Sequence, residues 1–212
     1  FHPLADLAIG SIYEKPSTRT RVSFEVGINR LGGYPLTLLK NDIQLGKSET
    51  VADTANVLSR FLGAITYRCF AHSDVAELAA NSSVPVINAL SDKHHPCQAA
   101  ADLMTIIEQF PDNDGLKVAY IGDGNNVLHD LMLACAMLGI EIHYACPKGY
   151  EPSSDIIERA EEHARENGSQ VIGTNDPHEA VANADVIYTD VFVSMGEEGL
   201  KDKLNDFEGF QV

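Results

Sequence analysis

A cluster of hydroxyl and guanidinium side chains follows the first apolar run of the chain. The run Leu7–Tyr13 is predicted to be a buried strand, and the segment STRTR, Ser17–Arg21, comes shortly after it. A helix is predicted from Ser17, its N-cap, to about Arg30. The N–H groups at the helix start, the hydroxyls and Arg19 together favour the binding of a phosphate-like anion. An ordinary capped helix with surface arginines would explain this segment alone equally well.

Further polar groups follow other predicted strands. Arg68 ends the predicted strand AITYR, and the segment HHPCQ, His94–Gln98, follows the strand VPVINAL. Further along the chain, GDGNN (Gly122–Asn126) follows KVAYI, and DVFVSMGEE follows DVIYT. Ligands of parallel α/β sheets bind beyond the carboxyl ends of the strands. This shared position indicates ligand sites more strongly than any one motif does.

The segment HHPCQ allows two kinds of chemistry. His95 and Cys97 are possible metal ligands, but no third ligand is apparent, and we predict no metal. A neutral His95 that donates to a carbonyl oxygen, with Gln98 one helical turn further on, fits a small carbonyl substrate better. A histidine that only caps the following helix is the simplest alternative.

The segment GDGNNV resembles a dinucleotide-binding GxGxxG motif, with Val127 in place of the third glycine. Such a site also needs an acidic residue at the end of the next strand, which here ends YACPKG. We therefore predict no nicotinamide cofactor, and Asn125 and Asn126 are free to bind an amino-acid substrate. Asp190 ends a predicted strand and could accept from a substrate ammonium, although composition alone favours a surface turn.

Strands and amphipathic helices alternate along the chain in two series, separated by the linker-like segment PDNDG at 111–115. This order predicts an α/β fold with two doubly wound parallel-sheet domains, 1–110 and 111–212. The chain begins with Phe1 rather than Met, and we expect it to be a piece of a longer protein with an incomplete second domain. The helix after the loop NDIQLGK is predicted to be capped by Ser48.

The charge of the chain is strongly acidic and unevenly distributed. The formal net charge is −16; residues 1–110 hold nine basic and eleven acidic residues, and residues 111–212 hold six and twenty. Nucleic-acid binding is therefore not expected. No apolar run is long enough for a membrane span, and no signal peptide is apparent. The four cysteines show no metal or disulfide spacing, which is typical of cytoplasmic proteins.

These motifs together resemble those of the aspartate/ornithine carbamoyltransferase family, from about His2 to the end of the chain. STRTR is the carbamoyl-phosphate motif of that family. HPCQ, DIQLG and DVFVSMGEE are similar to the segments of its ornithine branch. The resemblance implies transfer of the carbamoyl group of carbamoyl phosphate to the δ-amine of L-ornithine, giving L-citrulline and phosphate without a cofactor. It associates the chain with arginine biosynthesis and the urea cycle, while a biosynthetic or a degradative direction stays open.

The resemblance also implies a role for each matching residue. The phosphate would be bound by Ser17, Thr18, Arg19 and Thr20. The carbamoyl group would be held by Arg68, His95 and Gln98, and by Gln44 of a neighbouring subunit in a trimer or a multiple of trimers. L-Ornithine would be bound by Asn126, Asp190, Ser194 and Met195. The catalytic donors to the carbamoyl oxygen would be Arg68, His95 and Thr20.

The chain departs from the family pattern in three places. It lacks the later motif HCLP, whose cysteine is thought to orient ornithine, and none of the four cysteines replaces it. Asp130 lies where the family often has Ser, and Cys69 where Thr or Val is common. These departures leave two alternatives open: a carbamoyltransferase for aspartate, putrescine or an acetylated ornithine, or a non-catalytic carbamoyl-phosphate-binding paralogue.

Overall fold

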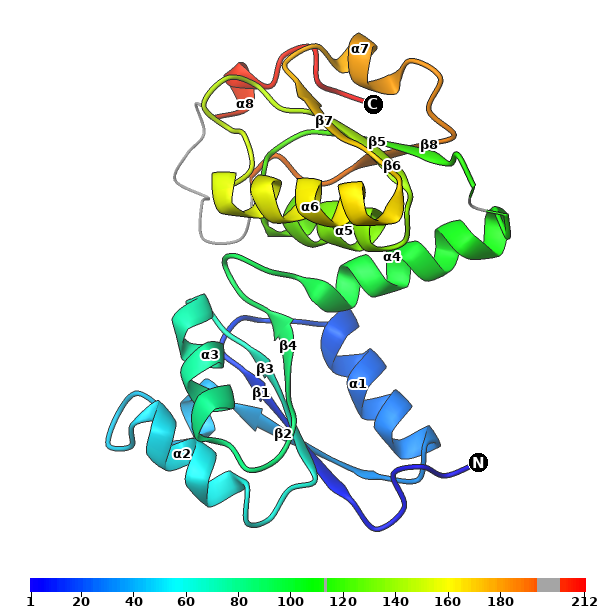
Figure 1. Cartoon of the computed structure of the whole chain (residues 1–212). Helices are drawn as coiled ribbons and strands as arrows, with labels where there is room; N and C mark the ends of the chain where they lie inside the picture. The colour runs from blue at the N-terminus through cyan, green and yellow to red at the C-terminus, as the bar shows by residue number, and fades with distance from the viewer. Residues whose placement is uncertain (113, 194–202) are drawn as a thin grey trace. The chain divides into compact units, whose positions relative to one another are not determined.

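The computed structural model describes residues 1–112, 114–193 and 203–212 (Figure 1). The backbone divides into two compact units, Phe1–Cys97 and Gln98–Val212. This division places the helix that follows HHP in the second unit, because Leu103 and Ile106 of that helix belong to the second core. The predicted boundary after residue 110 stays a prediction. Among the described residues, no helix is long and apolar enough to cross a membrane.

The first unit is a sheet of four parallel strands in the order β2-β1-β3-β4. Figure 1 shows α1 on one face of this sheet and α2 and α3 on the other. The elements of this unit are β1 (Ala8–Tyr13), α1 (Arg19–Arg30), β2 (Tyr34–Leu39), the 3-10 helix η1 (Lys40–Asp42), α2 (Val51–Leu58), β3 (Ala64–Arg68), α3 (His72–Asn81) and β4 (Val86–Leu90).

The second unit repeats this plan with the strand order β7-β6-β5-β8, again all parallel. Its elements are α4 (Pro96–Gln109), β5 (Lys117–Ile121), α5 (Asn126–Met137), β6 (Glu141–Ala145), α6 (Ser154–Asn167), β7 (Val171–Thr174), α7 (Pro177–Val181), β8 (Val186–Thr189) and α8 (Lys203–Asp206). The predicted class of two parallel α/β sheets is therefore confirmed.

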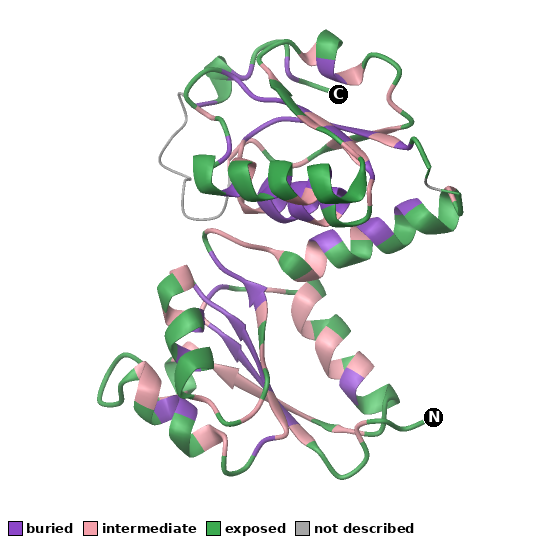
Figure 2. Ribbon diagram, viewed as in Figure 1, coloured by how far each residue is buried: buried purple, intermediate pink, exposed green. Residues whose placement is uncertain are grey.

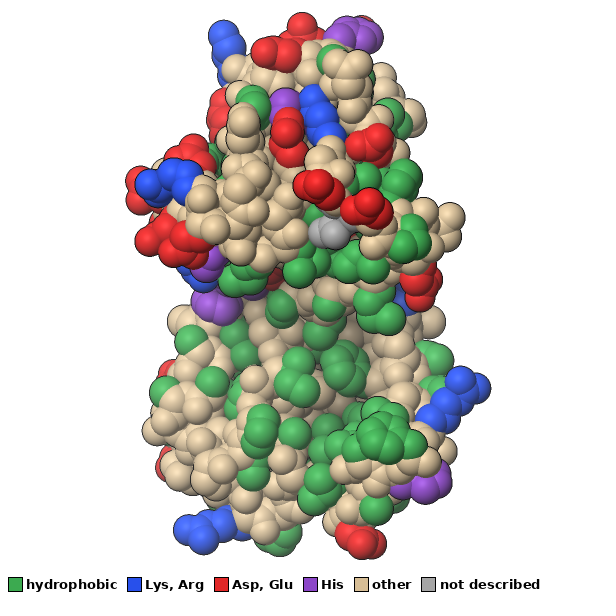
Figure 3. All heavy atoms as spheres, turned by 45° about the vertical axis from the view of Figure 1, so that its right-hand side comes forward, with side chains coloured by type: hydrophobic (Ala, Val, Ile, Leu, Met, Phe, Trp, Pro, Cys, Tyr) green, Lys and Arg blue, Asp and Glu red, His purple; other side chains and the backbone are tan. Residues whose placement is uncertain are grey.

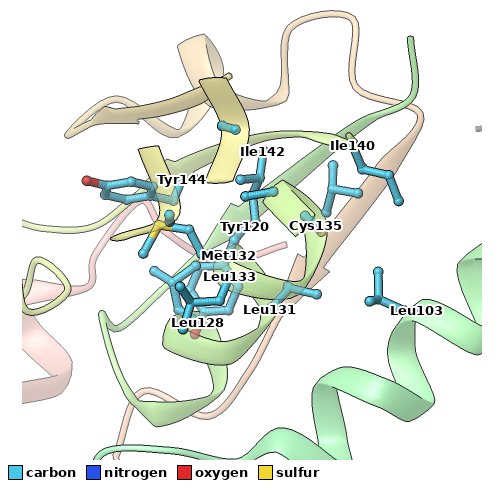
Figure 4. Packing of buried hydrophobic residues seen from close by; sticks show 14 of the residues in the cluster. Leu103, Tyr120, Leu128, Leu131, Met132, Leu133, Cys135, Ile140, Ile142 and Tyr144 are labelled. Atoms are coloured by element: carbon cyan, nitrogen blue, oxygen red, sulfur yellow. The ribbon is translucent and has the colours of Figure 1, made fainter. Parts of the chain in front are cut away.

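Each sheet is held by apolar side chains on its buried faces. In the first unit, Ile12, Ile65 and Tyr67 of the strands pack against Val75 and Leu78 of α3. In the second unit, α5 is buried along most of its length, whereas α6 buries one face and exposes the other (Figure 2). Tyr120, Leu128, Leu131 and Ile142 lie in the centre of this larger core (Figure 4). These cores fix the strand ends that carry the polar residues.

Two predicted helix caps are wrong. The N-cap of α1 is Thr18 and not Ser17, and its side chain makes no capping hydrogen bond within the described residues. The N-cap of α2 is Thr50 and not Ser48; its hydroxyl accepts from the Asp53 N–H at 3.0 Å and donates to the Asp53 carboxylate. Because Asp53 lies three residues after Thr50, this reciprocal pair outcompetes Ser48.

The acidic charge of the second unit lies largely on its surface. Figure 3 shows many Asp and Glu side chains on the part of the surface that this unit forms. Helix α6 carries five acidic residues on its exposed side, at positions 155, 158, 161, 162 and 166, and Glu151 precedes it. This pattern indicates a solvated acidic face.

Candidate functional site

The segment STRTR lies at the carboxyl end of β1, where three neighbouring strands end in register. Tyr13 pairs with Leu39 of β2 and with Arg68 of β3. A pocket of about 450 Å³ opens at this edge. It is lined by Tyr13, Glu14, Lys15, Pro16, Ser17, Thr18, Arg21, Leu39, Lys40 and Asn41. The sheet register therefore brings STRTR and Arg68 to one edge of the first unit.

Arg68 is a buried cation with few partners. Its exposed fraction is 5%, and its Nη1 donates to the Thr20 hydroxyl over a long 3.5 Å. Within the described residues, its Nε has no hydrogen-bond partner. Burial lowers the pKa of Arg68, and the nearby Arg19 guanidinium lowers it further. A guanidinium that is desolvated and close to a second cation is stabilised when an anion binds.

Lys15 is a second buried cation at the same edge, and it was not among the predicted site residues. Its exposed fraction is 9%, and its Nζ lies 4.9 Å from the centre of the Phe70 ring. Burial lowers its pKa, and the charge of Arg68 lowers it further. Its position two residues before Ser17 could have indicated a role in the site, but a lysine in a loop is usually solvated. Only the fold shows that this one is covered.

Arg21 and Glu14 are held in ion pairs around this pocket. The Arg21 Nε donates to Glu25 at 2.9 Å, and Thr37 donates to the same carboxylate oxygen, so Thr37 and then Arg21 lower the pKa of Glu25. Glu14 accepts from Lys40 and from the Phe70 N–H, both at 2.9 Å. Since its two carboxylate oxygens join the ends of β1, β2 and β3, Glu14 fixes the edge on which Arg68 lies.

The remaining predicted residues of the first substrate lie on other segments. His95 is half-buried in the loop between β4 and α4, and Gln98 is in the first turn of α4. By the backbone division, Gln98 belongs to the second unit, where its Nε2 donates to Asp102 at 2.8 Å. Gln44 is exposed on a loop after η1, and its Oε1 accepts from the Ser48 hydroxyl at 3.1 Å.

In the second unit, GDGNN and Asp190 meet at the carboxyl edge of the sheet. Ile121 pairs with Thr189, so Gly122 and Asp190 continue two neighbouring strands. Asn125, the N-cap of α5, accepts from two backbone N–H groups and donates its Nδ2 to Asp190 at 3.2 Å. Asn126 is the first residue of the helix. Ser194 and Met195, the other two predicted ornithine ligands, lie outside the described residues.

The glycines of GDGNN serve the packing of the chain itself. A Cβ on Gly124 would overlap the backbone of Tyr150, Glu151 and Pro152, and the Gly124 N–H donates to the Tyr150 carbonyl at 2.8 Å. Gly122 has a φ of 146°, in the region that favours glycine. These contacts explain both glycines without a dinucleotide.

A buried ion pair lies next to this edge, and neither of its residues was predicted to be part of a site. The Lys203 Nζ donates to Asp123 at 2.9 Å, and both side chains are at most 11% exposed. The pair joins α8 to the loop after β5, and Lys203 also lies 5.3 Å from the centre of the Tyr150 ring. Eighty residues separate the partners, so no local pattern indicates the pair.

The two unusual residues of the sequence are buried. Cys69 directly follows β3, its Sγ donates to the Ala71 carbonyl at 3.0 Å, and burial raises the pKa of its thiol to about 12. A neutral, covered thiol of this kind is structural rather than nucleophilic. Asp130 is 8% exposed within α5, one turn after the N-cap Asn125. It is thus part of the helix that carries Asn126.

Comparisons with known proteins identify the family. Residues 1–108 match the family described as aspartate/ornithine carbamoyltransferase, carbamoyl-P binding domain, and residues 114–212 match its Asp/Orn binding domain. The chain belongs to the aspartate/ornithine carbamoyltransferase family. The predicted resemblance is thereby confirmed.

Several similar proteins are named ornithine carbamoyltransferase. One from Anoxybacillus flavithermus is 52% identical over all of this chain and 68% of its own length. A Thermoplasma volcanium protein named ornithine carbamoyltransferase, catabolic, is also 52% identical, over all of this chain and 70% of its own length. The solved ornithine carbamoyltransferase of Pyrococcus furiosus is 51% identical with a TM-score of 0.95, covering 99% of this chain and 67% of that one. The chain thus spans about two thirds of the length of these relatives.

Proposed function

We propose that this chain transfers the carbamoyl group of carbamoyl phosphate to the δ-amine of L-ornithine, giving L-citrulline and phosphate. The observation that carries the proposal is the pair of buried cations, Lys15 and Arg68, beside STRTR in the unit that matches a carbamoyl-phosphate-binding domain. Two desolvated cations close together are unfavourable by themselves. An anion that neutralises both is the ligand such an edge selects.

The phosphate group of the substrate is assigned to STRTR. The hydroxyls of Ser17 and Thr18 and the N–H groups at the start of α1 are donors to its oxygens. Arg19 is exposed and can reach the phosphate with two parallel hydrogen bonds. The observation that the Thr18 side chain makes no capping hydrogen bond supports this assignment, because its hydroxyl does not occupy the N–H groups at the start of α1.

The carbamoyl group is assigned to Arg68, His95 and Thr20. The lone pair of the neutral δ-amine attacks the carbamoyl carbon, and negative charge builds on the carbonyl oxygen. The three side chains donate towards that oxygen, which lowers the barrier because the donors are already in place. The C–O bond to the phosphate then breaks, the phosphate leaves with the bonding electrons, and the attacking nitrogen passes a proton to the leaving phosphate. Gln98 holds the carbamoyl amino group.

L-Ornithine is assigned to Asn126, Asp190, Ser194 and Met195. The carboxylate of Asp190 accepts from a substrate ammonium, and support comes from Asn125, which donates to Asp190 Oδ2 and orients the carboxylate. Holding both substrates in one orientation can lower the barrier by about 7–11 kcal/mol. No covalent intermediate is needed.

The assembly and location follow from the resemblance of the sequence. We assign the chain to a homotrimer or a multiple of trimers in the cytoplasm, with Gln44 completing the carbamoyl-phosphate site of a neighbouring subunit. The exposure of Gln44 on its loop supports this role, since an exposed amide is available to a second chain. A place in arginine metabolism follows from the proposed reaction.

The deciding experiment measures carbamoyl products with three acceptors. The full-length protein is given carbamoyl phosphate with ornithine, putrescine or aspartate, and the matching product is quantified. Citrulline formation with ornithine alone is the expected result. Turnover with another acceptor would reassign the substrate, and carbamoyl-phosphate binding without any turnover would favour a non-catalytic paralogue.

A further inference from the structure

A hydrogen-bonded chain in the second unit ends on Gln98. The Gln98 Nε2 donates to Asp102 Oδ1 at 2.8 Å, one turn further along α4. The Tyr188 hydroxyl of β8 donates to the other oxygen, Oδ2, at 2.9 Å. Asp102 is half-buried, and the Tyr188 ring stacks on Tyr120 with ring centres 5.8 Å apart. Each oxygen of Asp102 therefore has one defined donor.

The chemistry of these groups allows one orientation of Gln98. A carboxylate only accepts hydrogen bonds, whereas a carboxamide has a donating NH2 end and an accepting oxygen end. If the amide of Gln98 turned by 180°, its Oε1 would face the negatively charged Oδ1 of Asp102. That arrangement loses a charge-assisted hydrogen bond and adds a repulsion. The carbonyl oxygen of Gln98 is therefore directed away from Asp102.

We propose that Asp102 is a positioning residue that makes Gln98 present its carbonyl oxygen, an acceptor, to the NH2 group of carbamoyl phosphate. The inference rests on the proposed function, in which Gln98 holds the carbamoyl end of the substrate. An inverted amide would offer a donor to a donor and would not bind that NH2 group. Asp102 thus selects for a carbamoyl group without contacting it.

The two hydrogen bonds act on the pKa of Asp102 in the direction that this geometry requires, although burial outweighs them. Burial raises the pKa of Asp102, while the hydrogen bonds from Gln98 and Tyr188 oppose that rise. Both donors therefore favour the ionised carboxylate, the form that accepts only. Tyr188 has a second effect, because its bond to Oδ2 leaves Oδ1 to Gln98.

The test compares two ligands that differ only at the group in question. Acetyl phosphate has a methyl group where carbamoyl phosphate has NH2, so the orientation of Gln98 should affect only the second ligand. The substitution Asp102→Asn keeps the size of the side chain but gives it one donor and one acceptor, so Gln98 can turn either way. We expect the Kd of carbamoyl phosphate to rise about three- to tenfold, as for a lost hydrogen bond. The Kd of acetyl phosphate should stay within about twofold.

The matched control is Tyr188→Phe, which removes the bond to Asp102 Oδ2 and the contact of the Tyr188 hydroxyl with Gln98, but leaves Asp102 Oδ1 as the acceptor for Gln98. It should keep the ratio of the two Kd values within about twofold of the wild type, whereas a merely structural network would respond equally to both changes. Equal losses for both ligands in Asp102→Asn, or no change in either, would overturn the inference. Wild-type protein that forms no citrulline would instead refute the proposed function, independently of these ratios.

Discussion

Replacing Arg68 with methionine should make the free protein more stable and the ligand-bound protein less stable. Within the part of the chain that the structure describes, the buried Arg68 has an unpaired Nε and one long bond, to Thr20. Leaving a buried donor unpaired costs about 1–3 kcal/mol, and a hydrogen bond stretched to the limit of its range contributes little, about 0.5 kcal/mol. Methionine fills a similar volume without either group. Arg68→Met should therefore raise the free energy of unfolding by about 1 kcal/mol, or about 2–4 °C in Tm.

The same substitution should weaken the binding of carbamoyl phosphate. Hydrogen bonds to charged groups contribute about 1.5–3 kcal/mol, which corresponds to about a 10- to 150-fold rise in Kd. Turnover should fall by a further factor of about 10²–10³, because Arg68 donates to the oxygen on which charge develops. At ligand concentrations 100 times its Kd, the wild type gains about 2.7 kcal/mol. The order of the two stabilities should then reverse.

Thermal unfolding with and without carbamoyl phosphate measures both effects in one assay. Arg60→Met is the matched control, because Arg60 is exposed in the turn after α2 and the substitution should change stability by no more than about 0.5 kcal/mol. The reasoning is refuted if Arg68→Met lowers the stability of the free protein by 1 kcal/mol or more. That result would show that Arg68 stabilises the fold of the free protein rather than being a destabilising cation that an anionic ligand neutralises.

Four further perturbations test other parts of the site. Arg19→Ala should weaken carbamoyl-phosphate binding by about 1.5–3 kcal/mol in a calorimeter, and unchanged binding would remove Arg19 from the phosphate site. Asp190→Asn should raise the KM of ornithine and leave the Kd of carbamoyl phosphate nearly unchanged, whereas equal losses would indicate misfolding. Because the pKa of Lys15 is lowered, the free energy of unfolding should rise as pH increases from that lowered value towards the ordinary 10.5. Lys15→Met should flatten this slope in denaturant titrations, and an unchanged slope would contradict the burial of its charge. Gly124→Ala should lower stability by about 1–3 kcal/mol through overlap with the backbone at Tyr150. Gly27→Ala in α1 should instead raise stability by about 0.5–1 kcal/mol, because a Cβ there meets no atom within 4 Å.

The sequence predicts those features that depend on local pattern. Alternating strands and helices predict both parallel sheets, and the polar residues placed after strands lie at their carboxyl ends. The helix caps show the limit of local reasoning. Ser17 and Ser48 are suitable cap residues, but the helices begin later, at Thr18 and Thr50, where the backbone geometry and the reciprocal bond with Asp53 decide. Neighbouring hydroxyls compete at each start, and sequence alone does not rank them.

Features that depend on contacts between residues far apart in the sequence could not be predicted from it. Lys203 and Asp123 are eighty residues apart, and Tyr188 reaches Asp102 over eighty-six. Burial of Lys15 likewise depends on Phe70, which follows a different strand. A polar residue can be recognised from its type and position, but its partner and its desolvation arise only when the sheet brings separate loops together. The motif therefore predicts which side chains contact a ligand, and the fold determines which other residues keep those side chains in position.

The buried cations at the edge of the first sheet show why contacts between distant parts of the chain matter for function. A lysine and an arginine that were merely surface residues would be solvated, and their charges would attract an anion only weakly in water. Burial of Lys15 and Arg68 removes that solvent, and the carboxylates of Asp92 and Glu14 only partly offset the repulsion that Lys15 experiences from Arg68. This repulsion lowers the stability of the free protein, and a bound anion relieves it. Part of the affinity for the anion therefore comes from the relief of this repulsion. For this reason the free-protein stability of Arg68→Met is a more direct test of the site than its lost activity.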